Sequence, residues 1–224
     1  MKSFWRIISS SETLIEDAKK DCIHMLDAGE EMFRIVSNTL KEKTDKEELK
    51  AVRRMDKALN QEVRDVRKKV YEHLAISRGK DLVSGLQLIT IVIDLERIGD
   101  YTKNLVELVE MIPEKMEFGA LEDTYTSVHK KTLKMFLLVR QAFTKEDEKK
   151  AREALKLYDD VSKTCDGTTR EIIRGETSAE NVCKPDLALL LFMRYMKRIN
   201  AHLKNVATSI VNPFHMIGFR PGAM

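Results

Sequence analysis

The stretch that decides the fold is Leu95-Glu96-Arg97-Ile98-Gly99-Asp100, which is followed by Asn104. It returns in altered form as Met196-Lys197-Arg198-Ile199-Asn200-Ala201, which is followed by Asn205. Two copies of one unit are expected to fold alike and to pack against each other, so the repeat predicts a chain of two similar halves. The second copy lacks both carboxylates of the first. Any chemistry that needs these acids is therefore predicted in the first half alone.

A second pair of segments supports the duplication. Residues 55–60 (MDKALN) align with residues 157–162 (LYDDVS), at nearly the same separation as the first pair. The segment around residues 55–60 also repeats apolar residues every three or four positions, which is typical of a helix with one buried face. Two helical segments in register with their copies make chance similarity a poor explanation.

The composition favours long helices in an all-α fold. Of 224 residues, 43% are hydrophobic and 33% charged, while only nine are Gly and four Pro, which leaves few turn formers. Apolar spacing and turn residues together predict six helices. The predicted helices span residues 11–40, 46–76, 81–112, 121–143, 145–174 and 185–211.

These helices are predicted to form two pseudo-symmetric three-helix bundles. The first unit covers residues 1–112 and the second covers residues 113–211. Residues 212–224 form a tail with two prolines, which cannot continue as a helix. Its aromatic residues are expected to fold back on the bundle.

Charge and hydropathy exclude several classes of function. A formal net charge of +3 provides no strong positive field for nucleic acid, so no nucleic-acid partner is expected. The longest apolar run, residues 187–192, is too short to span a membrane. The three cysteines are scattered without metal-site spacing, which favours reduced thiols in a cytoplasmic protein.

The third predicted helix carries the candidate chemistry. Glu96 and Asp100 lie one turn apart on one face, and on the preceding helix Asp56 and Asn60 have the same spacing. Antiparallel neighbours bring the two pairs face to face. Their oxygen donors suit Mg²⁺, Mn²⁺, Ca²⁺ or iron better than zinc or copper. The chain has no ExxH motif, which argues against a ferritin-like di-iron oxidase.

A second interpretation of the same helix stays open. Two apolar stripes run along it, one in line with the acids and one opposite them. If the opposite stripe forms the core, Glu96 and Asp100 belong to the solvated face and carry no site. The opposite stripe consists of Ile91, Leu95, Ile98, Leu105 and Val109.

The motif at residues 95–105 resembles the signature of the PhoU family, LERIGDxxxN followed by an apolar residue, and residues 55–60 resemble the second-helix motif of that family. The resemblance covers nearly the whole chain as two repeats. It implies a cytoplasmic protein of six helices in two bundles, often dimeric, that binds metal clusters at its acidic motifs. It also implies negative regulation of phosphate uptake through contacts with the phosphate ABC transporter and a sensor kinase.

Motif matching makes Asp56, Asn60, Glu96 and Asp100 the candidate metal ligands, for one or more Fe, Mn, Mg or Zn ions. We therefore expect a non-enzymatic regulator of phosphate transport, homeostasis and signalling, acting as a homodimer. One alternative is an enzyme that activates water with a metal held by these carboxylates. Another is a metal-free helical adaptor.

The second unit departs from the family pattern. Tyr158 and Ser162 replace the polar residues expected on its middle helix, and Lys197 and Ala201 replace the two acids. An ammonium at Lys197 repels a bound cation and can pair with a neighbouring carboxylate such as Asp160. No metal site is therefore expected in the second unit.

Overall fold

The computed structural model describes residues 2–39, 46–112, 115–176 and 183–222, with side chains from Leu14 onward. Six long helices account for most of these residues, and no strand occurs among them, which confirms the predicted all-α class. The helices are α1 (Lys2–Thr39), α2 (Lys46–Ile76), α3 (Leu82–Met111), α4 (Glu122–Lys145), α5 (Glu148–Ile173) and α6 (Lys184–Val211). Two short 3₁₀ helices are η1 (Gly119–Leu121) and η2 (Phe214–Met216).

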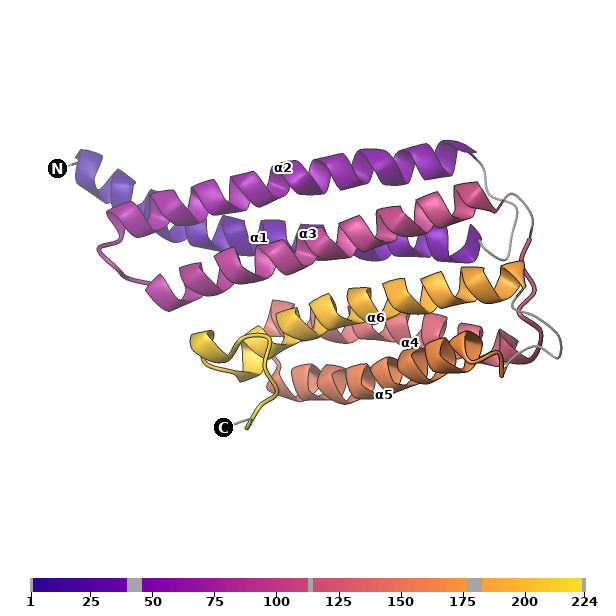
Figure 1. The fold of residues 1–224 in the computed structure, drawn as a ribbon. Helices are drawn as coiled ribbons and strands as arrows, with labels where there is room; N and C mark the ends of the chain where they lie inside the picture. Colours follow the sequence, from indigo (N-terminus) through magenta and orange to yellow (C-terminus); the bar gives the residue numbers. More distant parts are fainter. Residues whose placement is uncertain (1, 40–45, 113–114, 177–182, 223–224) are drawn as a thin grey trace.

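The six helices form two layers of three, as the repeat predicts (Figure 1). Helices α1, α2 and α3 pack together, and α4, α5 and α6 do the same. The layers meet where α3 lies along α6 and α1 lies along α4, while α2 and α5 lie on the outer sides. The two outer helices therefore occupy equivalent places in the two units.

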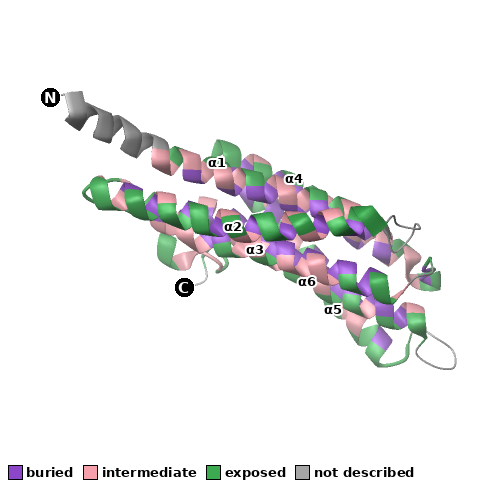
Figure 2. Cartoon of the chain, turned by 90° about the horizontal axis from the view of Figure 1, so that it is seen from above, coloured by how far each residue is buried: buried purple, intermediate pink, exposed green. Residues whose placement is uncertain are grey.

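Regular apolar spacing explains the core of each layer. Val52, Leu59, Val63, Val66 and Val70 of α2 are all buried, at spacings of seven, four, three and four residues that keep them on one helix face. Figure 2 shows the buried positions running along the faces between helices. Each buried Val or Leu side chain contributes about 1.5–3 kcal/mol relative to an exposed one, so these stripes hold the bundles together.

The first helix differs in length from the sequence-based expectation. It begins at Lys2 instead of residue 11 and continues to Thr39. No Gly or Pro interrupts residues 2–10, so nothing in the sequence stops the helix from extending in that direction. Among the described residues, no helix is long and apolar enough to cross a membrane.

The tail folds back onto its own chain through polar contacts. The Asn212 side-chain amide donates to the carbonyl oxygens of Met216 (2.8 Å) and Phe219 (2.9 Å), and the Gly218 amide donates to Thr208 Oγ1 (2.8 Å). Gly218 has φ +88°, a conformation that favours glycine. The Phe219 side chain remains 60% exposed, so hydrogen bonds fix this tail more than its aromatic residues do.

Candidate functional site

Helices α2 and α3 place the predicted acids on the outer flank of the first unit. The stripe opposite the acids, which includes Ile91, Leu95 and Ile98, is buried and forms the core. Asp56 of α2 is also buried, at 7% exposure, whereas Asp100 is partly exposed. The acids therefore lie at the edge between the core and solvent.

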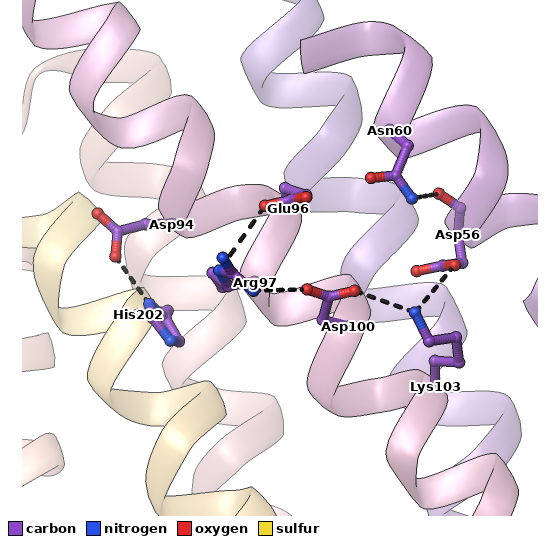
Figure 3. Close-up of polar contacts among 8 residues, drawn as sticks. All are labelled: Asp56, Asn60, Asp94, Glu96, Arg97, Asp100, Lys103 and His202. Carbon is purple, nitrogen blue, oxygen red and sulfur yellow. Dashed lines mark hydrogen bonds and ion pairs between the residues drawn. The ribbon is translucent and has the colours of Figure 1, made fainter.

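A lysine ammonium lies between the two closest acids. Lys103 Nζ of α3 is 3.0 Å from Asp100 Oδ1 and 3.4 Å from Asp56 Oδ2 (Figure 3). Burial lowers the pKa of Lys103, but the hydrogen bond to Asp100 and the charges of Asp56 and Asp100 outweigh it, so the pKa is raised. The chain thus places a permanent positive charge where the sequence predicted a bound cation.

The other two candidate ligands have separate partners. The Asn60 side-chain amide donates to the main-chain oxygen of Asp56 in its own helix, at 3.0 Å. Glu96 Oε2 lies 3.8 Å from Arg97 Nε, and the Arg97 guanidinium also donates to Asp100 at 3.0 Å. Of the four predicted ligands, only Asp56 and Asp100 share a partner, and that partner is a cation of the protein itself.

This arrangement does not fit a metal ion as it stands. In the part of the chain that the structure describes, no three His, Cys, Asp or Glu side chains are grouped so that they could hold one. Lys103 and Arg97 already neutralise the nearby carboxylates, and a metal ion would have to displace the Lys103 ammonium. The four-residue metal site therefore stays a prediction.

Gly99 allows α2 and α3 to approach closely at this point. A methyl group on Gly99 would lie 2.8 Å from Leu59 Cδ1 and 3.8 Å from Asp56 Oδ1. Such a short contact forces a neighbour to shift. The glycine of the repeated motif thus sets the spacing that brings Asp56 within reach of Lys103.

A polar network that the sequence did not reveal joins the two units. Asp94 of α3 lies 2.8 Å from His202 Nδ1 and accepts a hydrogen bond from Asn205 Nδ2 at 2.8 Å, both on α6. The Tyr101 ring stacks on the His202 ring with centroids 5.7 Å apart. A signal existed, because Asn205 is part of the repeated motif and the two units were expected to pack against each other.

The second unit replaces the acidic set by different contacts. Lys204 occupies the position of Lys103, with Tyr158 in place of Asp56. Lys204 Nζ donates to the Gly218 carbonyl at 2.6 Å and lies 5.6 Å from the centre of the Tyr158 ring. Burial, the largest cause, lowers the pKa of Lys204. A tail carbonyl and an aromatic face thus surround this lysine where carboxylates surround its counterpart.

Lys197 pairs with a neighbouring carboxylate as expected, but that carboxylate is not Asp160, the example given by the sequence. Lys197 Nζ instead lies 2.6 Å from both carboxylate oxygens of Asp166, while Asp160 pairs with Lys131 of α4 at 2.6 Å. The axial offset between α5 and α6 brings Asp166 next to Lys197, and this offset is not visible in the spacing along either helix.

The fold and the acidic motif define a class: an all-helical protein built from a duplicated three-helix unit. The family model of the PhoU domain matches this chain twice, over residues 22–109 and 125–210. The chain therefore belongs to the PhoU domain family, which confirms the resemblance carried by the repeated motif. Comparison with curated proteins finds no match.

Two solved structures are similar to the whole fold. PhoU from Pseudomonas aeruginosa has 22% sequence identity and a TM-score of 0.79, with 89% of this chain and 96% of that chain covered. The phosphate transport system regulatory protein PhoU from Streptococcus pneumoniae has 19% sequence identity and a TM-score of 0.78, with 90% of this chain and 95% of that chain covered. At these identities the likeness establishes the fold.

Proposed function

We propose that this protein is a non-enzymatic regulator of phosphate transport that acts by binding other proteins. The observation that carries the proposal is the double match to the PhoU domain, which spans both units. The similar protein from Streptococcus pneumoniae is described as a phosphate transport system regulatory protein. Long packed helices present extended surfaces that are suited to protein contacts.

The finer proposal is negative regulation of phosphate uptake and signalling by a cytoplasmic homodimer. Its partners would be components of the phosphate ABC transporter or of a sensor kinase. The candidate site supports a binding role more than catalysis, because the carboxylates that would activate water in a metal enzyme are engaged by Lys103 and Arg97.

Phosphate uptake in cells that lack this protein is the direct test. Uptake of radioactive phosphate under phosphate-replete conditions should rise when the gene is deleted and return to normal when it is restored. Unchanged uptake after deletion would contradict negative regulation.

Purification of the tagged protein from replete and starved cells should recover transporter or kinase components, and recovery of neither would contradict the proposed partners.

A metal-free adaptor is the second candidate, and a specific observation favours it. The Lys103 ammonium contacts both Asp56 and Asp100, which balances their charge without a bound ion. Metal analysis of protein purified without chelators distinguishes the two candidates. Metal that is present in the wild type and lost in both Glu96→Ala and Asp100→Ala would establish the predicted site; metal absent from all three would establish the adaptor.

A further inference from the structure

A broad cleft lies on the second unit between α5 and the folded tail. Its volume is about 810 Å³, and its lining includes four cationic side chains and two carboxylates, a formal excess of two positive charges. The cations are Lys163, Arg170, Lys204 and Arg220, and the acids are Asp159 and Asp166. The cleft is thus a concave surface with an excess of positive charge.

Both carboxylates of the cleft are already paired. Asp159 pairs with Arg220 at 2.7 Å, and Asp166 pairs with Lys197 at 2.6 Å. The side chains of Lys163 and Arg170 make no hydrogen bond or ion pair with any described part of the chain. The positive charge of these two exposed side chains is therefore not neutralised from within the protein.

The spacing of the residues leaves room for a ligand between these cations. Lys163, Gly167 and Arg170 follow each other at four- and three-residue intervals, so they share one face of α5. A methyl group on Gly167 would meet no atom within 4 Å, which leaves open space between the two cations. From α6, Lys204 reaches the same cleft with only one of its three N–H donors used in the bond to Gly218.

We propose that this cleft binds a phosphate-type oxyanion through Lys163, Arg170 and Lys204. A guanidinium offers paired N–H donors that match two oxygens of such an anion, and ammonium groups add compact charge. The open shape suits a small multi-oxygen anion or a phosphate group on a larger soluble ligand. This inference concerns ligand binding alone and goes beyond the regulatory role proposed above.

The equivalent flank of the first unit differs mainly in the surroundings of its lysine. The positions that correspond to Lys163, Gly167 and Arg170 are Gln61, Asp65 and Lys68 of α2, so only one of the two exposed cations has a cationic counterpart there. Lys103, the counterpart of Lys204, is held by two carboxylates. The lysine that lines the cleft in the second unit is therefore engaged by acids in the first.

Isothermal titration calorimetry of the full chain at fixed ionic strength tests the proposal. The probes are inorganic phosphate and adenosine triphosphate, which separate a free anion from a phosphate group on a larger ligand. The variant Lys163→Ala/Arg170→Ala removes the two unpaired cations. The matched control is Lys57→Ala/Lys68→Ala, which removes the same charge from exposed positions of α2.

At least one probe should bind the wild type. The α5 variant should bind that probe at least about ten-fold more weakly, because the loss of two charge-assisted hydrogen bonds costs more binding free energy than a ten-fold change in Kd represents. The control should stay within about two-fold of the wild type, since surface charge at a distance is screened. Binding of phosphate identifies a free anion, and binding of the nucleotide alone identifies a larger ligand. Binding of neither probe, or equal weakening by the control variant, overturns the proposal and leaves the regulatory role untouched.

Discussion

Lys103 and Lys204 occupy the same position in the two copies of the repeated motif, yet their surroundings shift their pKa values in opposite directions. Lys103 contacts Asp56 and Asp100, and its pKa is raised. Lys204 contacts a backbone carbonyl, and burial lowers its pKa. The lysine is thus paired with carboxylates in the first unit and with a main-chain carbonyl in the second.

Removal of the first of these lysines should destabilise the protein. Lys103→Ala leaves Asp56 and Asp100 close together without their shared cation, and like charges repel. We expect a loss of about 1 kcal/mol in the free energy of unfolding, a modest value because Lys103 and Asp100 keep contact with water. Urea denaturation measures it, with Lys57→Ala as the exposed control.

The same variant tests whether a metal ion can replace the lysine. Millimolar Mg²⁺ or Mn²⁺ should raise the melting temperature of Lys103→Ala more than that of the wild type, because ligand binding to the folded state stabilises it. An equal response of both proteins would show that the carboxylates do not form a cation site even when the ammonium is absent.

His129 should make the stability of the protein fall in mild acid. It lies between α1 and α4, with Nε2 2.8 Å from Ser37 Oγ, and burial, reinforced by the charges of Arg34 and Lys130, lowers its pKa below 6.5. Below pH 6.5 the His129 position therefore binds more protons in the unfolded chain than in the folded one. The contribution of neutral His129 to stability is complete above that pH and declines as the pH falls toward the folded-state pKa.

Denaturation midpoints at pH 7.5 and 5.5 measure this effect. His129→Gln removes the titrating group, and its stability should fall less between the two pH values than that of the wild type. His24 should change stability with pH in the opposite direction. Its hydrogen bond to Glu62 raises its pKa, so protonated His24 stabilises the protein mainly below pH 6.5. An equal decline in the wild type and in His129→Gln would contradict the assignment.

Two helical glycines should respond oppositely to alanine. Gly167 has open space around it, so Gly167→Ala should stabilise the protein by about 0.5–1 kcal/mol by restricting the unfolded backbone. Gly99 packs against the buried side chain of Leu59, so Gly99→Ala should cost about 1–2 kcal/mol. Thermal unfolding of both variants checks the contrast, and stabilisation by Gly99→Ala would disprove the close contact.

The network between the units should contribute to their association. Asp94→Ala removes the acceptor for Asn205 and the partner of His202, which should cost about 2 kcal/mol because two partly buried polar groups lose their partner. Asp94→Asn keeps one acceptor oxygen and should cost less. Equal stability of both variants and the wild type in chemical denaturation would show that solvent replaces these contacts freely.

The fold was largely predictable from sequence because the same signals occur twice. Apolar spacing located all six helices, and the repeated motif indicated two similar units that pack against each other. The start of α1 was missed because no capping or breaking residue marks it. Helix ends depend on weak local preferences, whereas the helix faces depend on many buried side chains together.

The candidate site was only partly predictable. The acids were placed on the correct two helices, but Lys103 was overlooked, since a long flexible side chain can reach several neighbours and spacing does not select one. The pairing of Lys197 with Asp166 depends on the axial offset between α5 and α6, which no single-helix pattern encodes. Contacts across helices therefore required the three-dimensional arrangement.

The contact of Lys103 with both acids also bears on how the protein tolerates changes in its surroundings. A counterion that is covalently part of the polypeptide arrives in one copy with every chain, as soon as α3 folds against α2. It cannot dissociate, be chelated or be exchanged for a competing ion. Scarcity of divalent ions would consequently leave the packing of the N-terminal bundle intact.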